Sequence, residues 1–102
     1  MSYKDCIKKI SGDKKGDIFV FALSTCGWCA KTKELLNKLK VEYCYVDVDL
    51  LDLKQREEVK KEFDKYKTDF SFPKVRINNK IISGFQPEEI KKAIKDKAEN
   101  KK

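Results

Sequence analysis

Histidine is absent from this chain of 102 residues. It is the side chain that most often acts as a general base near neutral pH, and it is also the commonest zinc ligand. Any catalysis by this protein must therefore rest on cysteine, carboxylate, lysine or backbone groups.

Long hydrophobic runs are also absent. The longest covers six residues, 18–23, whereas a membrane-spanning helix needs about 20. The first six residues likewise lack an apolar segment of secretory length. We therefore expect a cytoplasmic protein with no membrane partner. In that compartment the four cysteines are expected to be catalytic or buried rather than a structural disulfide framework.

The chain shows no internal repeat and no linker, and its length allows one small domain. We expect a single domain over residues 1–102. It is divided into an N-terminal helix and loop (1–16), a core (17–98) and a tail (99–102).

Positive charge dominates, with 24 lysines and arginines against 17 acidic residues and a net charge of +7. The lysines are spread over nearly every segment, which favours solvated helix faces. The alternative is a basic surface that steers acidic partners or anionic peptides toward the protein. No basic stretch is interleaved with aromatic residues, so we expect no nucleic-acid partner.

Hydrophobic periodicity predicts an α/β fold. Apolar residues at helical spacing predict four helices, at residues 3–10, 26–40, 54–66 and from 87 onward. The apolar run 18–23 fits a strand covered on both faces, and residues 41–48 suit a second strand. Residues 74–83 are expected to form a hairpin. The result is a four-stranded mixed sheet flanked by helices, in which the first two strands run parallel.

The tetrapeptide Cys26-Gly27-Trp28-Cys29 lies between the first predicted strand and the helix that follows. Two cysteines on the first turn of a helix have Cα atoms about 5–6 Å apart, which permits a disulfide. A Cys-x-x-Cys at a strand-to-helix junction is typical of a thiol–disulfide redox centre. The helix start favours a thiolate at Cys26, whereas Cys29 should be more buried. We expect Cys26 to attack a substrate disulfide and Cys29 to resolve the mixed disulfide.

Two alternatives for the tetrapeptide are half of a zinc site and a chance pairing. A four-cysteine zinc site would also need Cys6 and Cys44, and neither belongs to a second Cys-x-x-Cys. We therefore predict no metal ligands, and we expect Cys6 and Cys44 to be buried apolar residues rather than redox partners.

Pro73 follows Ser71-Phe72 and directly precedes the predicted hairpin. A proline cannot donate a hydrogen bond to a sheet, so it belongs at the first residue of a strand. Its peptide bond is either cis, as in a tight approach, or trans, at the end of an ordinary loop.

Over residues 17–98 the chain resembles glutaredoxins of the thioredoxin superfamily. Three features support the resemblance: the Cys26–Cys29 pair after a strand, Ser71-Phe72-Pro73 at the place of the family's cis-proline signature, and Gly84 after the hairpin. The resemblance implies a thioredoxin-like (glutaredoxin) fold with a cis Pro73. It also implies a thiol–disulfide oxidoreductase that reduces protein or glutathione mixed disulfides, with Cys26 and Cys29 as catalytic residues. The residues implied in substrate or glutathione binding are Trp28, Lys33, Phe72, Pro73, Gly84 and Phe85.

Two departures from the family pattern bear on the electron source. The tetrapeptide differs from the common Cys-Pro-Tyr-Cys, and Phe85-Gln86 replaces an acidic residue that often lies near the glutathione γ-glutamyl group. Ser83-Gly84-Phe85 followed by Pro87 is similar to NrdH-like redoxins, which accept electrons from thioredoxin reductase. The resemblance thus implies a monomer that acts on disulfide-containing proteins, with glutathione or thioredoxin reductase as the electron source.

The resemblance implies no tightly bound cofactor, with glutathione as a candidate co-substrate. The alternative from another functional class is a glutaredoxin that holds an iron–sulfur cluster between two protomers, through Cys26 and glutathione.

Overall fold

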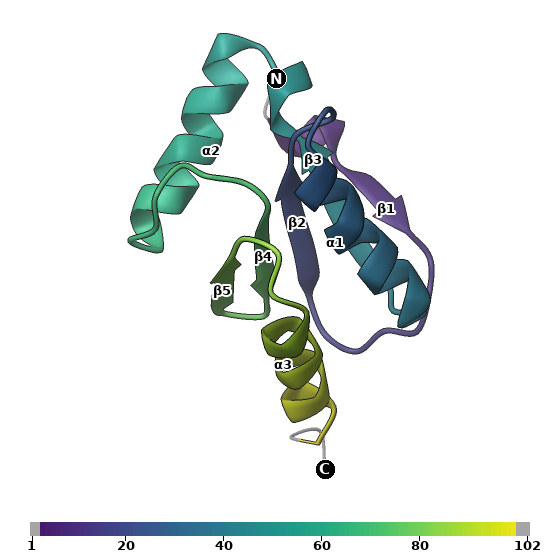
Figure 1. Ribbon diagram of the computed structural model, residues 1–102. Coiled ribbons are helices and arrows are strands. Elements are labelled where there is room, and N and C mark those ends of the chain that lie inside the picture. Colours follow the sequence, from purple (N-terminus) through teal and green to yellow (C-terminus); the bar gives the residue numbers. More distant parts are fainter. Residues whose placement is uncertain (1–2, 100–102) are drawn as a thin grey trace.

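The computed structural model describes residues 3–99, apart from the side chains of residues 4, 6 and 95–99. Its centre is a five-stranded sheet in the order β1-β3-β2-β4-β5 (Figure 1). The strands are β1 (Lys8–Ile10), β2 (Ile18–Ala22), β3 (Tyr43–Asp47), β4 (Lys74–Ile77) and β5 (Lys80–Ser83). Strand β2 pairs in parallel with β3 and antiparallel with β4, which confirms the predicted mixed sheet.

Helices cover both faces of this sheet. They are α1 (Gly27–Lys38), α2 (Leu53–Lys65) and α3 (Pro87–Glu99), with short 3₁₀ turns η1 (Tyr3–Cys6) and η2 (Val48–Leu50). On one face, Val20 and Ala22 of β2 pack in one cluster with buried residues of α1 and α3. On the other face, Phe19 and Phe21 pack with buried residues of α2. The alternation of side chains along a strand therefore produces two cores and a three-layer α/β/α fold.

The N-terminal segment differs from the prediction. The expected helix over residues 3–10 ends at Cys6, and residues 8–10 form strand β1, so the sheet has five strands rather than four. Strand β1 pairs antiparallel with the edge of β3, with Lys9 opposite Cys44. A three-residue strand is too short to show alternation in the sequence. Its exposed Lys8 and Lys9 also discourage the addition of a further strand.

The remaining elements agree with the predictions. Helix α1 begins inside the Cys-x-x-Cys tetrapeptide, and β4 and β5 form the predicted hairpin. Asn78 in its turn has a φ of 57°, a left-handed conformation that asparagine tolerates. Of the expected tail, only Glu99 lies within the described residues. No helix between residues 3 and 99 is long and apolar enough to cross a membrane.

Candidate active site

Cys26 is positioned by the end of β2 and the start of α1. The backbone N–H of Cys26 donates to the carbonyl oxygen of Leu23 at 3.2 Å, which closes the short connection between strand and helix. Cys26 is the N-cap residue of α1, and its Sγ accepts the backbone N–H of Cys29 at 3.2 Å. The first N–H groups of a helix lack partners within the helix and form its positive end. The Cys26 sulfur therefore lies at the positive end of the helix that it caps.

Cys29 lies in a different environment, although it is only one turn further along α1. Its side chain is 1% exposed, and its Sγ accepts the backbone N–H of Leu23 at 3.4 Å. Burial, followed by the hydrogen bond with Cys26, raises the pKa of the Cys29 thiol to about 12. Both thiols are free, and Cys26 is the more exposed of the two. The site therefore contains one accessible sulfur at a helix N-terminus and one buried, protonated sulfur beneath it.

Two carboxylates hold the segments around the cysteines. The Asp49 carboxylate accepts the backbone N–H of Ser24 at 2.8 Å and also the Ser24 hydroxyl, and these hydrogen bonds lower the pKa of Asp49. The Asp47 carboxylate pairs with the ammonium group of Lys33 at 3.1 Å. The same ammonium lies 4.0 Å from the ring centroid of Tyr45. Lys33 is thus bound within its own domain rather than directed to solvent.

Pro73 and Gly84 lie beside one another. The Phe72–Pro73 peptide bond is cis, which decides between the two expected isomers. The backbone N–H of Gly84 donates to the carbonyl oxygen of Pro73 at 2.8 Å. Gly84 has a φ of +80°, a conformation that glycine adopts without strain. Phe72 packs against both hydrophobic clusters, including the cluster that contains Cys29.

Trp28 and Phe85 form an aromatic contact across the site. Their ring centroids are 5.7 Å apart, and the side chain of Trp28 is 58% exposed. The Lys31 ammonium lies 5.0 Å from the centroid of the Trp28 ring. An exposed aromatic surface therefore extends from the Cys26–Cys29 pair to the turn after β5.

Lys74 was not expected to contribute to the site. Its side chain is fully buried, and its Nζ lies 2.8 Å from the Ser83 hydroxyl and 2.9 Å from that of Thr68. It also contacts the Ser71 hydroxyl at 3.2 Å and the exposed Asp69 carboxylate at 3.0 Å. The hydrogen bond from Lys74 lowers the pKa of Asp69. Lys74 thus connects the segment before Pro73 to the residue before Gly84.

The other cysteines lie outside this arrangement. Cys44 is a free, half-buried thiol on β3, and the side chain of Cys6 is outside the described residues. Among the side chains that the structure describes, no three from histidine, cysteine, aspartate or glutamate gather closely enough to hold a metal ion.

A family model described as Glutaredoxin matches residues 18–82. The chain belongs to the glutaredoxin family. It is 41% identical to the glutaredoxin from Methanosarcina mazei Go1, with a TM-score of 0.79 over 88% of each chain. It is 39% identical to methanoredoxin from Methanosarcina acetivorans, with a TM-score of 0.80 over 85% of this chain and 94% of the other. An uncharacterized glutaredoxin-like 8.6 kDa protein of the Clostridium pasteurianum rubredoxin operon is 36% identical over 78 residues, 76% of this chain and 96% of the relative.

Family membership and the placement of the cysteines together define the activity. Cys26 and Cys29 are adjacent at the start of α1, where the redox motif of this family lies. The protein is a glutaredoxin-family thiol–disulfide oxidoreductase.

The reduced protein should show unequal alkylation of its two active-site thiols. With iodoacetamide near neutral pH, Cys26 should be modified well before Cys29, because Cys29 is buried and its raised pKa keeps it protonated. The alkylation rate of Cys29 should continue to rise as the pH is raised toward the Cys29 pKa of about 12. Mass spectrometry of the cysteine peptides measures both rates, with the half-buried Cys44 as an internal reference. Equal rates for Cys26 and Cys29 at neutral pH would contradict this description of the site.

Substitution of Lys74 should weaken both the fold and the site. Lys74→Met removes the donor from three hydroxyl groups and should lower the free energy of unfolding by about 1–3 kcal/mol. Because Pro73 and Gly84 would be held less firmly, KM for a disulfide substrate should rise more than kcat falls. Urea unfolding and steady-state kinetics test both effects. Lys80→Met, at an exposed position on β5, is the matched control and should change neither quantity appreciably.

Proposed function

We propose that this protein reduces disulfides in protein substrates by dithiol exchange, with Cys26 as the attacking thiol and Cys29 as the resolving thiol. The asymmetry between the two sulfurs supports this division. The accessible Cys26 caps the N-terminus of α1, so its sulfur lies at the positive end of the helix. The buried Cys29 is protonated at neutral pH and cannot be the first nucleophile.

The exchange balances in two steps. The Cys26 thiolate attacks one sulfur of the substrate disulfide; a Cys26–substrate bond forms, and the first substrate sulfur leaves as a thiolate that takes up a proton. The Cys29 thiol then loses its proton and attacks Cys26. The Cys26–Cys29 disulfide forms, and the second substrate sulfur leaves and is protonated. The substrate gains two electrons and two protons. The cysteine pair supplies both electrons and the proton of Cys29, and the solvent, which took up the Cys26 proton when the thiolate formed, supplies the other proton.

The electrostatics of the pair supply the order of these steps. After burial, the main causes that raise the pKa of Cys29 include its hydrogen bond with Cys26 and the charge of Cys26. Both causes disappear when Cys26 is held in a mixed disulfide, because its sulfur then carries no charge. The nearby Lys33 ammonium acts in the opposite direction and lowers the pKa of Cys29. Cys29 therefore becomes easier to deprotonate at the point where it must attack.

The substrate is proposed to lie across the exposed face beside Cys26. Trp28 and Phe85 offer aromatic surface there, and their contact orients both rings. The backbone around Phe72 and Gly84, held together by the bond from Gly84 to Pro73, is proposed to contact the substrate chain next to its disulfide. This assignment gives a binding role to each residue implied by the resemblance except Lys33, whose proposed role is electrostatic.

For the electron source, we propose a protein donor of the thioredoxin reductase type rather than glutathione. Two observations support this choice. The Lys33 ammonium is bound to Asp47, which removes one cation that could bind a glutathione carboxylate. Phe85 packs against Trp28 and extends an apolar surface suited to a protein partner.

Serine variants test the roles of the two thiols. Cys26→Ser should reduce disulfide reduction to background, because Cys29 is buried and protonated and Cys44 lies on β3. Cys29→Ser should accumulate a covalent mixed disulfide with the substrate, which intact-mass spectrometry detects. Cys44→Ser serves as the control and should retain activity. Full turnover by Cys26→Ser would overturn the proposal.

Coupled assays test the electron source. NADPH oxidation should be faster with thioredoxin reductase than with glutathione and glutathione reductase, when the same disulfide substrate is used in both assays. The reverse order would overturn the donor proposal and would leave the dithiol mechanism intact.

A further inference from the structure

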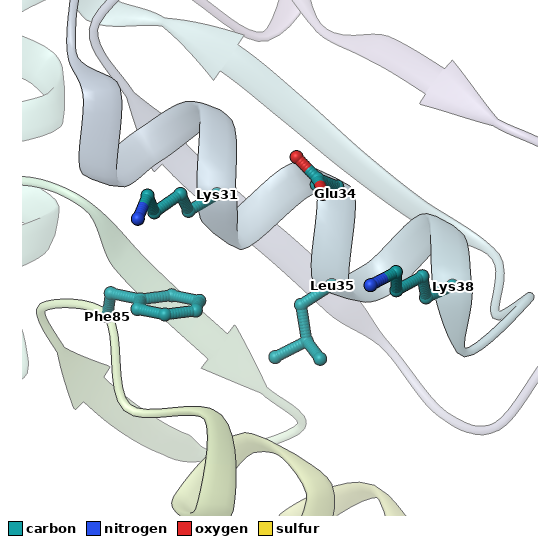
Figure 2. A pocket seen from close by; sticks show the side chains of 5 residues that line it. All are labelled: Lys31, Glu34, Leu35, Lys38 and Phe85. Atoms are coloured by element: carbon teal, nitrogen blue, oxygen red, sulfur yellow. The ribbon is translucent and has the colours of Figure 1, made fainter.

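A groove runs along the exposed side of α1, next to the active site. It is lined by Lys31, Glu34, Leu35, Lys38 and Phe85 and has a volume of about 260 Å³ (Figure 2). We call it the α1 groove. Phe85 closes it from the turn between β5 and α3, and the same ring contacts Trp28 inside the Cys26–Cys29 tetrapeptide. The groove is thus a continuation of the surface on which the substrate disulfide must lie.

The groove combines unpaired positive charge with apolar surface. Neither Lys31 nor Lys38 forms an ion pair with a described residue, although Glu34 lies within one turn of both. Figure 2 shows the side chains of Glu34 and Leu35 pointing to different sides of the helix, with Leu35 on the side of Phe85. The apolar floor of Leu35 and Phe85 therefore has, toward each end, an ammonium group that forms no ion pair with a described residue.

We propose that the α1 groove binds an acidic, partly apolar segment of the protein substrate and thereby selects substrates with carboxylates near their disulfide. The inference rests on the proposed reduction of protein disulfides. Charge complementarity supports the proposal, since two lysines that have no ion-pair partner among the described residues attract anionic side chains. An adjacent leucine and phenylalanine favour an apolar residue between those anions.

The geometry of the helix fixes the spacing of the expected sequence. At a rise of about 1.5 Å per residue, Lys31 lies about 7.5 Å and Lys38 about 18 Å along α1 from Cys26. An extended peptide spans about 3.3 Å per residue. Carboxylates are therefore expected about two and about five residues from the substrate cysteine, with an apolar residue between them to contact Leu35.

Synthetic disulfide peptides test this preference. The first pair of peptides carries aspartates at the second and fifth positions from the cysteine, with a leucine between them. One peptide has this segment on the N-terminal side of the cysteine, and the other has it on the C-terminal side. In the matched pair, asparagines replace the aspartates. One acidic peptide should be reduced with a higher kcat/KM than its asparagine partner, and sodium chloride should diminish the difference.

Charge-removing variants locate the preference. Lys31→Gln and Lys38→Gln should each lower the acidic-to-neutral ratio of kcat/KM by about two- to fivefold, the range expected for an exposed ion pair. Glu34→Gln should raise the ratio. Lys61→Gln makes the same charge change on an exposed position of α2 and should leave the ratio unchanged.

The possible outcomes separate the two proposals. If both kinds of peptide are reduced equally well, the groove has no such role and the proposed function stands. An equal loss of preference in Lys61→Gln would also overturn the inference, because the net charge of +7 would then steer substrates without the groove. If neither peptide is reduced, the proposed function itself fails.

Discussion

The burial of strand β2 on both faces is the constraint on which the rest of the structure depends. All five of its residues are buried, and successive side chains belong to different clusters. Cys29 packs in the same cluster as Val20 and Ala22. The packing that stabilises the sheet therefore also holds the Cys29 sulfur against the N–H of Leu23. Residues 23–26 have little freedom, since a packed strand lies before them and a packed helix after them.

That constraint produces two sulfurs of opposite character within one helical turn. Cys26 is only partly buried and lies at the point where the unpaired N–H groups of α1 begin. Cys29 lies inside the core, so burial favours its neutral form. The hydrogen bond from the Cys29 N–H to the Cys26 Sγ joins the two residues. It forms because α1 begins at Gly27, which makes Cys26 the N-cap residue. The redox pair is thus a consequence of where a buried strand ends and a helix starts.

Local patterns were sufficient to predict this part of the molecule from the sequence. A six-residue apolar run, the Cys-x-x-Cys spacing and the stripe on the following helix are all short-range signals. The order of elements and the hairpin were predicted for the same reason. Strand β1 was missed because its partner, the edge of β3, lies more than 30 residues away and gives Lys8–Ile10 no signature of its own. Apolar residues at helical spacing predicted a helix over residues 3–10, which is wrong beyond Cys6.

Side-chain partners were harder to predict than elements. Along β4, charged and apolar residues alternate, beginning with Lys74 and Val75. This pattern is typical of a strand with one solvated face, yet Lys74 is fully buried. It is buried because oxygens from Thr68 and Ser83 converge on its ammonium group, and such a convergence depends on the tertiary fold. The resemblance implied a binding role for Lys33 but gave no sign of its partner within the domain, Asp47, which lies fourteen residues away. Sequence patterns locate a charge on an element but do not supply its partner.

The ion-pair partners of the lysines show which of the positive charges are available at the surface. A net charge of +7 spread over many lysines cannot by itself distinguish a solvated surface from a recognition surface. The structure separates lysines that pair with a carboxylate, such as Lys33 and Lys74, from lysines that form no ion pair with a described residue. Lys31 and Lys38 are of the second kind, and they lie on the helix whose first turn contains both active-site cysteines. The helix whose N-terminus Cys26 caps therefore also carries these two positive charges beside the active site.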